Sequence, residues 1–91
     1  MKIDPCITDV LEARRFLSGR VRKTPLERSA PLSEGAGASA SVYLKWENQQ
    51  ICGSFKVRGA LNKMFSLGAD EKQRGVVTAS SGNHAQGIAM A

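Results

Sequence analysis

The stretch that decides the fold is VYLKWENQQICGSFKVRGA, residues 42 to 60, because the spacing of its apolar residues changes halfway along. Val42, Leu44 and Trp46 face one way and the residues between them face the other, which is the period of a half-buried strand. From about Ser54 the apolar residues recur with helical spacing instead. The predicted helix face comprises Val57, Ala60, Leu61, Met64 and Phe65. A strand, a connection at 48–53 and a helix are therefore expected.

The residues before this stretch predict a helix and an extended arm. We expect the helix to run from about Asp9 to Ser18, with Thr8 as its N-cap and a glycine at its stop. Pro25 disfavours a helical conformation at the residue before it, so residues 22–29 should be extended. Residues 30–41 are rich in small side chains and are expected to form a loop, with one helical turn near Leu32.

The residues after the stretch repeat the strand-to-helix order. Gly68 is expected at the C-terminal end of the helix that begins near Ser54, followed by a polar link at 69–75. VVTA at 76–79 is rich in β-branched residues and predicts a short buried strand. The sequence HAQGIAMA at 84–91 is expected to open another helix.

Strands that alternate with helices predict an α/β fold with a parallel sheet flanked by helices. We interpret residues 1–91 as a single partial domain. It consists of an N-terminal helix and extended arm at 1–41, followed by strand, helix, strand and helix at 42–91. Two strands do not complete such a sheet, and the last helix has no stop signal. The expectation is therefore an N-terminal portion of a longer architecture.

Composition excludes several classes of protein. The chain has 91 residues, enough for one small domain at most, and no apolar run approaches the roughly 20 residues that span a bilayer. The first nine residues, MKIDPCITD, lack the apolar core of a signal peptide, so a cytoplasmic protein with no membrane partner is expected. Two cysteines, Cys6 and Cys52, and one histidine form no metal-binding pattern, so no metal is expected.

The chain is basic, with a formal net charge of +5. Five cationic residues gather within ten positions: Arg14, Arg15, Arg20, Arg22 and Lys23. Such a cluster is compatible with a surface that binds nucleic acid. The alternative is a solvated basic face, which is favoured here because charge without a recognition motif is weak evidence.

SSGNH, residues 80–84, lies between the predicted strand and the last helix. In an α/β sheet such a turn lies at the carboxyl end of a strand, where ligands bind. Free N–H groups at the helix start favour an anion, and Gly82 lets the backbone approach it closely. The turn therefore predicts a carboxylate- or phosphate-binding site. The alternative is an ordinary tight turn with a serine N-cap.

Lys56 is the second residue with a chemical interpretation. It should lie in the first turn of a helix, where the positive helix end and partial burial beside Phe55 would both disfavour its charged form. A neutral lysine amine can form a Schiff base with an aldehyde. The alternative is a solvated surface lysine, as expected for Lys63 and Lys72.

Taken together, these segments resemble a known family. GSFKVRGA at 53–60 followed by SSGNHAQG at 80–87 is similar to the pyridoxal-phosphate enzymes of the tryptophan-synthase-β-like fold, also called fold type II. Within that fold the sequence most resembles the threonine/serine dehydratases (ammonia-lyases) and serine racemase. RKTPLERS at 22–29 and VYLKWENQQ at 42–50 match that group as well, so the resemblance covers about residues 20–91.

The resemblance implies roles for individual residues. The catalytic residues would be Lys56, which holds the cofactor pyridoxal 5'-phosphate as a Schiff base, and Ser81, the second acid/base of the racemase relatives. Phe55 would pack beside the cofactor ring, and Asn83 would hydrogen-bond its 3-hydroxyl. The loop that grips the substrate carboxylate would comprise Ser80, Ser81, Gly82, Asn83 and His84. His84 has a second interpretation, as a cap of the new helix.

The resemblance implies that the full-length parent, as a homo-oligomer, converts L-threonine or L-serine to a 2-oxo acid and ammonia. It also suggests a place in amino-acid metabolism such as isoleucine biosynthesis. Serine racemase is the alternative of the same fold, and a non-catalytic fragment or basic binding module is the alternative of another class. The sequence departs from the family at Cys52, where many relatives carry threonine, and it contains no match to the family's glycine-rich phosphate loop.

Overall fold

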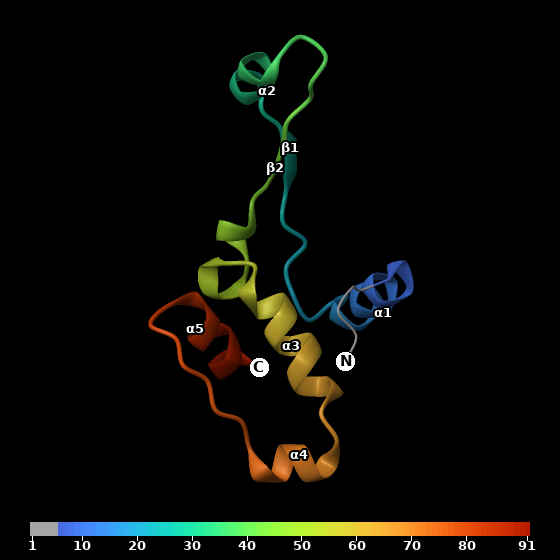
Figure 1. Cartoon of the computed structure of the whole chain (residues 1–91), viewed down its shortest axis with the longest axis vertical. Coiled ribbons are helices and arrows are strands. Elements are labelled where there is room, and N and C mark those ends of the chain that lie inside the picture. Colours follow the sequence, from blue (N-terminus) through green and yellow to red (C-terminus); the bar gives the residue numbers. More distant parts are fainter. Residues whose placement is uncertain (1–5) are drawn as a thin grey trace.

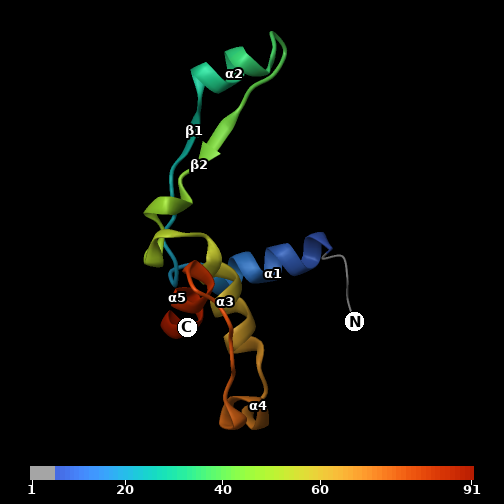
Figure 2. The ribbon, with the colours of Figure 1, turned by 60° about the vertical axis from the view of Figure 1, so that its left-hand side comes forward.

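The computed structural model describes residues 6–91, and these residues form an elongated molecule of 54 × 30 × 25 Å. A body made of α1 (Ile7–Leu17), α3 (Lys56–Ser66) and α5 (Asn83–Met90) carries two projections. One projection holds β1 (Leu26–Arg28), α2 (Ala30–Ala36) and β2 (Tyr43–Lys45), and the other holds α4 (Ala69–Arg74). Figures 1 and 2 show these projections at opposite ends of the long axis.

Helix α1 begins earlier than its sequence predicts. The backbone N–H of Cys6 donates to the Asp9 carboxylate at 2.8 Å, so the N-cap is Cys6 and the predicted cap at Thr8 is wrong. The Asp9 side chain at the third helical position reaches back to the cap, so Thr8 lies inside the first turn at the second helical position. The helix ends at Leu17 and Gly19 follows with a φ of 79°, as the predicted glycine stop requires.

The projecting hairpin differs from the predicted loop. β1 and β2 pair antiparallel, with Leu26 opposite Lys45 and Arg28 opposite Tyr43. Between them residues 30–36 form helix α2, longer than the single turn expected there, because Ser29 caps it by accepting from the Leu32 N–H at 3.3 Å. The alternation predicted for the strand is confirmed: the side chains at 42, 44 and 46 are partly buried, whereas those at 43 and 45 are exposed.

Helix α3 carries the core, as its pattern predicts. Val57, Ala60 and Leu61 are buried, and Val57 and Leu61 form a cluster with Leu17 of α1. Phe65 stays half exposed, although its ring packs 5.4 Å from that of Phe16. The buried apolar face of α3 therefore packs against α1.

The polar link expected at 69–75 is instead mostly helix α4. Gly68 directly follows Leu67, the C-cap of α3, as predicted; it is also the N-cap of α4, and its N–H donates to the Glu71 carboxylate at 2.8 Å. Asp70 and Glu71 lie in the first turn of α4, and Lys72 and Arg74 lie in its last turn. These charges suit the positive and negative helix ends, which explains why a wholly polar segment folds as a helix.

The strand predicted at 76–79 is wrong. Residues 76–80 form no regular element, and Val77 is fully exposed. Within residues 6–91 the sheet consists of β1 and β2 alone and is antiparallel, so the expected parallel sheet is not formed there. A strand needs a neighbour for its backbone N–H and C=O groups, and no described segment lies in position to supply one. No helix among the described residues is long and apolar enough to cross a membrane.

Candidate active site

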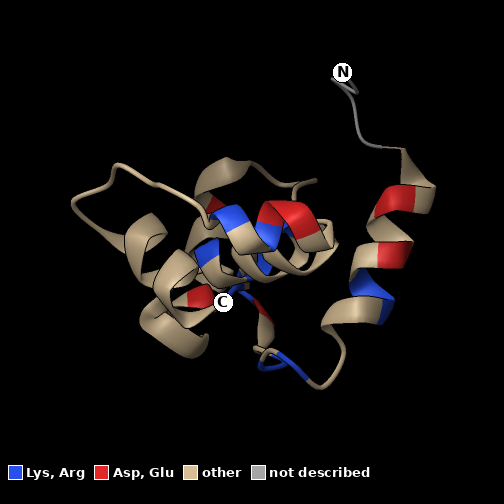
Figure 3. Ribbon diagram, turned by 90° about the horizontal axis from the view of Figure 1, so that it is seen from below, with Lys and Arg blue, Asp and Glu red and all other residues tan. Residues whose placement is uncertain are grey.

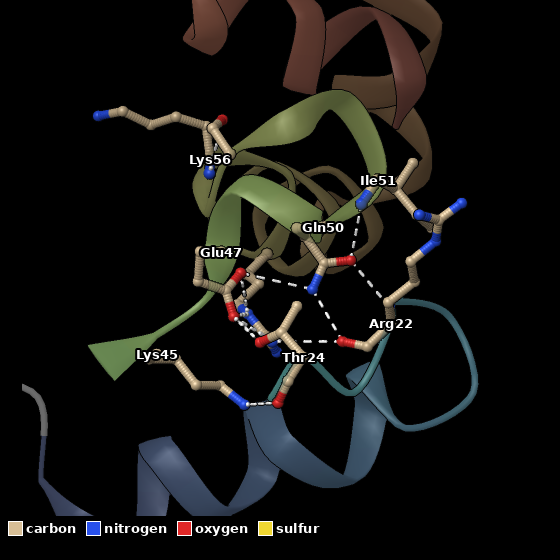
Figure 4. Close-up of polar contacts among 9 residues, drawn as sticks. Arg22, Thr24, Lys45, Glu47, Gln50, Ile51 and Lys56 are labelled. Atoms are coloured by element: carbon tan, nitrogen blue, oxygen red, sulfur yellow. Dashed lines mark hydrogen bonds and ion pairs between the residues drawn. The ribbon is translucent and has the colours of Figure 1, made fainter. Parts of the chain in front are cut away.

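The side-chain amide of Gln50 connects the arm at 22–24 by hydrogen bonds to the turns that precede Lys56. These turns are two short 3-10 helices, η1 (Glu47–Gln49) and η2 (Ile51–Gly53). The Gln50 Oε1 accepts from the N–H groups of Arg22 at 2.8 Å and Ile51 at 2.9 Å, and its Nε2 donates to the Arg22 carbonyl at 2.8 Å. Figure 4 shows these bonds converging on one buried amide. The connection between strand and helix is therefore held in one conformation.

Glu47 and Arg58 add an ion pair to the same network. The Arg58 guanidinium donates to the Glu47 carboxylate at 2.6 Å, and the Thr24 hydroxyl donates to it at 2.8 Å. Hydrogen bonds from Arg58 lower the pKa of Glu47 from 4.5 to about 2, with smaller contributions from Thr24 and Gln50 and with burial acting in the opposite direction. Arg58 belongs to the first turn of α3, so the pair ties that turn to η1.

Two successive residues with positive φ form the backbone turn that precedes Lys56. Cys52 has a φ of 64° and Gly53 a φ of 69°, a left-handed conformation that is uncommon for a residue with a side chain. Ser54, which follows the turn, is buried. Its Oγ accepts a hydrogen bond from the Lys56 N–H at 3.4 Å. The start of α3 at Lys56 is thus fixed by backbone geometry and by a polar contact.

The Lys56 side chain points away from this network. Figure 4 shows it extending to the side opposite Gln50 and Arg22. Its Nζ lies 4.9 Å from the centre of the Phe55 ring, and no hydrogen bond or ion pair joins it to another residue within 6–91. Lys56 is exposed and Phe55 is 58% exposed, so the partial burial expected at this position is wrong. The structure presents an accessible amine beside an accessible aromatic ring.

The turn at 80–84 begins α5 without a side-chain cap. Gly82 is the N-cap and lacks a capping side chain, whereas the Ser80 Oγ accepts from the Gly82 N–H at 3.2 Å. The alternative of a serine N-cap at this turn is therefore wrong. His84 is exposed at the second position of α5, so its interpretation as a cap is wrong as well. Residues 80–84 are all exposed, and the first N–H groups of the helix remain available to an anion.

The structure brings the two chemical segments together. α3 and α5 lie side by side and run in the same direction in Figures 1 and 2, so their starts face the same end of the molecule. Gly87 of α5 lies against the backbone of Lys56. Four residues of helix, about 6 Å, separate Gly87 from Asn83. The backbone of Lys56 and the uncapped start of α5 therefore lie about one helical turn apart.

Sequence reasoning missed the residues that hold this arrangement, namely Glu47, Gln50, Arg58 and Gly87. A signal existed for Gly87, because a glycine within a helix-favouring run weakens the helix and usually has a packing reason. No comparable signal existed for the other three, whose partners lie up to 36 positions away. No group of His, Cys, Asp and Glu in the described range could hold a metal ion.

Comparison with known proteins gives these two segments a common context. Residues 17–91 match the protein family described as pyridoxal-phosphate dependent enzyme. The chain belongs to this family. It is 52% identical over 85 residues to an L-threonine ammonia-lyase of Thermotoga maritima, covering 93% of this chain and 21% of that protein. It is 49% identical over 84 residues to the L-threonine dehydratase catabolic TdcB of Escherichia coli K12, covering 92% of this chain and 25% of that protein.

A solved structure shows the same fold. The structure of maize serine racemase superposes with a TM-score of 0.76 at 37% identity, covering 91% of this chain and 26% of that one. The likeness confirms the family resemblance and the α/β fold class predicted above, although the described residues do not form the parallel sheet. The chain spans a quarter or less of the length of the first curated relatives it matches.

Proposed function

We propose that this chain carries the catalytic lysine of a pyridoxal-phosphate-dependent dehydratase that converts L-threonine or L-serine into a 2-oxo acid and ammonia. The observation that carries the proposal is that α5, whose start has no side-chain cap, packs through Gly87 against the backbone of Lys56. An amino-acid substrate presents its reacting α-carbon next to a carboxylate, so it needs an amine and an anion site close together. The names of the bacterial relatives support the reaction, and the activity is proposed for the longer parent protein.

The residues present fit the cofactor that the family name implies. The Lys56 amine is accessible to an aldehyde and is engaged by no hydrogen bond or ion pair within the described residues. The exposed Phe55 ring next to it offers an apolar face to an aromatic group. Asn83, at the start of α5, would donate a hydrogen bond to the ring hydroxyl. When bound, pyridoxal phosphate supplies an electron-withdrawing ring that stabilises negative charge at the α-carbon.

The chain's own residues would then act on the substrate in a definite order. Residues 80–84 bind the carboxylate through backbone N–H groups and the hydroxyls of Ser80 and Ser81, which orients the α-hydrogen toward Lys56. Lys56 would accept that proton on Nζ. The β-hydroxyl would leave as water with a proton returned from Nζ, and the released enamine would take up water to give the 2-oxo acid and ammonia.

The assignment of Lys56 is tested by absorbance. Pyridoxal phosphate added to the full-length parent should give the visible band of the lysine-bound cofactor, and Lys56→Ala should remove it together with activity. Lys63→Ala changes an exposed lysine of the same helix and should leave both unchanged. A band that survives in Lys56→Ala would rule out the assignment.

A second candidate of the same fold is serine racemase. The likeness to the maize serine racemase structure favours it, and Ser81 lies in the exposed turn that would face the substrate. A racemase needs a second acid/base on the opposite face of the α-carbon, and we propose Ser81 for that role. Chiral analysis of serine after incubation with the parent distinguishes the two reactions. D-serine formation that Ser81→Ala abolishes would favour the racemase, and pyruvate without D-serine would favour the dehydratase.

A third candidate is a basic binding module without catalysis. A cavity of about 650 Å³ between α1 and the following turn is lined by five cationic residues and no acidic one. These residues are Arg14, Arg22, Lys23, Lys45 and Arg58. Figure 3 shows the basic part of α1 continuing into a basic turn. A DNA or RNA probe that shifts at low salt and is released as salt rises would support this candidate, and the absence of a shift at low salt would exclude it.

The cellular setting is also a proposal. We propose a cytoplasmic homo-oligomer that acts on a small amino acid and binds neither membrane nor nucleic acid. A role in amino-acid metabolism agrees with the family. The word catabolic in the names of the Escherichia coli and Staphylococcus aureus relatives supports degradation more than the isoleucine biosynthesis that the resemblance also implied. Sedimentation of the parent would test the oligomeric state.

A further inference from the structure

Gly87 is the point at which α5 touches the first turn of α3. It is buried, and a Cβ placed on it would lie 3.2 Å from the carbonyl carbon of Lys56. The same Cβ would lie 3.3 Å from the Lys56 carbonyl oxygen and 3.3 Å from the Val57 nitrogen. All three atoms belong to the backbone of α3, so they cannot turn aside as the end of a flexible side chain can. The approach of the two helices therefore depends on glycine at this position.

Other helix glycines of the chain do not have such a contact. Gly35 in α2 and Gly59 in α3 would each accept a Cβ with nothing within 4 Å. The contact at Gly87 is reinforced by its neighbour, because the Cys52 Sγ of η2 lies 3.9 Å from the Gln86 carbonyl oxygen. The second turn of α5 therefore contacts both η2, through Cys52, and the start of α3, through the backbone of Lys56 and Val57.

This contact sets the distance between the two chemical segments. Gly87 lies one helical turn after Asn83, and Lys56 is the residue whose backbone it touches. Moving α5 outward by even part of a methyl group's width would move the turn at 80–84 with it, because a helix behaves as a rigid rod over one turn. A misplacement approaching 1 Å at a reacting group can reduce its rate about 100-fold.

We propose that Gly87 is a positioning residue: its missing side chain fixes the spacing at which one small anionic substrate can reach both the Lys56 amine and the turn at 80–84. The inference rests on the proposed function and adds the residue that sets the geometry of its site. It concerns this chain's own residues, so it can be tested on the 91-residue chain with a probe other than the cofactor.

Glyoxylate is a suitable probe because its aldehyde and carboxylate occupy adjacent carbons, as the α-carbon and carboxylate of an amino acid do. A lysine amine condenses with the aldehyde and releases water, and cyanoborohydride then supplies a hydride to the same carbon. The product, carboxymethyl-lysine, is located by mass spectrometry after proteolysis. Acetaldehyde undergoes the same reaction without a carboxylate and gives ethyl-lysine. The measured quantity is the ratio of labelling at Lys56 to labelling at Lys63, an exposed lysine of the same helix.

In the unmodified chain this ratio should be roughly threefold or more higher with glyoxylate than with acetaldehyde, because orientation by the carboxylate favours Lys56. Gly87→Ala should bring the glyoxylate ratio down to the acetaldehyde ratio. Gly59→Ala introduces the same methyl group into a helix with free space around it, so it should keep the glyoxylate preference and raise the melting temperature. A purely structural role for Gly87 would change stability but not this difference between the two aldehydes.

A second variant covers the case in which circular dichroism shows that Gly87→Ala does not fold. Cys52→Gly removes the η2 side chain that contacts the Gln86 carbonyl of α5, introduces no clash, and glycine suits the φ of 64° at that position. It should lower the glyoxylate preference while the chain stays folded. If the preference is intact in the folded variants, Gly87 is not a positioning residue, although the proposed function stands. If the unmodified chain shows no preference, the pairing of Lys56 with the turn is wrong and both proposals fall.

Discussion

Gln50 satisfies hydrogen-bonding groups on two distant segments because its side-chain amide is both an acceptor and a donor. It is 3% exposed, and it holds both backbone groups of Arg22 while also reaching Ile51 and Glu47. Replacing it would leave buried backbone groups without partners, and such groups are costly in a medium of low polarity. At the scale of the residue, polar side chains hold the turn that leads to Lys56.

We therefore predict that Gln50→Ala destabilises the chain by about 1–3 kcal/mol. The unfolding free energy can be measured by urea denaturation. Gln49→Ala is the matched control, because the Gln49 side chain is exposed and only its backbone carbonyl contacts Arg22. The control should change stability by less than about 0.5 kcal/mol. Equal effects in the two variants would mean that the Gln50 bonds contribute nothing beyond a general loss of side chain.

At the scale of elements, the ion pair between Glu47 of η1 and Arg58 of α3 determines how the helix leaves the connection. The carboxylate of Glu47 also accepts from Thr24, so one side chain joins the arm, η1 and α3. The arm and η1, which contribute no buried apolar residue, are thereby fixed relative to α3. The pKa of Glu47 is lowered because the hydrogen bonds from Arg58 stabilise its charged form.

This coupling predicts a particular loss of stability in acid. The pKa of Glu47 is lowered from 4.5 to about 2 in the folded chain, so the carboxylate contributes stability that is fully present above pH 4.5. That contribution should disappear as the pH falls from 4.5 to 2. Between pH 4.5 and 2, the unfolding free energy of Glu47→Gln should change less than that of the unmodified chain. Urea denaturation at several pH values measures both.

The matched control for the acid experiment is Glu34→Gln, which changes an exposed carboxyl of α2. The unfolding free energy of this variant should vary with pH in the same way as that of the unmodified chain. If Glu47→Gln also follows the unmodified chain between pH 4.5 and 2, the ion pair does not exist in solution.

At the scale of the whole molecule, the core is small and lies where α1, α3 and α5 meet. Leu17, Val57 and Leu61 form it, with Ile51 and Ala91 packed against its edge. The hairpin with α2 projects from one end and α4 from the other, as Figure 2 shows. The extended segment at 75–80 is exposed along its whole length, so its apolar residues contribute nothing to this core.

A pair of valines tests this distribution. Val57→Ala should destabilise the chain by about 2 kcal/mol, because a wholly buried side chain leaves a cavity. Val77→Ala should change stability by less than about 0.5 kcal/mol, because the Val77 side chain is fully exposed. Urea denaturation of the two variants gives the comparison. A loss of unfolding free energy in Val77→Ala as large as that in Val57→Ala would show that residues 75–80 are packed in solution.

Part of the fold and of the site could be predicted from the sequence. The apolar period of 54–67 determined the buried face of α3, and the alternation at 42–46 determined which side of the hairpin strand is covered. The Lys56 and 80–84 segments could be singled out because their residue types carry amine and anion-binding chemistry. These are local properties, since a helix or strand pattern depends on neighbours within a turn or two.

Other features were decided only by tertiary structure. VVTA at 76–79 has the composition of a buried strand, but a strand exists only when another segment satisfies its backbone, and none among residues 6–91 does so. The polar residues at 69–74 became a helix once Gly68 and Glu71 closed its first turn. The partners of Gln50 and Glu47 could not be read from the sequence, because hydrogen bonds between distant segments leave no periodic pattern.

The sequence by itself determined which residues could do the chemistry: an amine at position 56, an anion-binding turn at 80–84 and a helix to present each of them. Only the tertiary structure decided that these two helix starts share one end of the molecule, with Gly87 lying on the Lys56 backbone. The physical reason is that side-chain chemistry belongs to each residue, whereas the distance between two segments depends on how closely their backbones can pack.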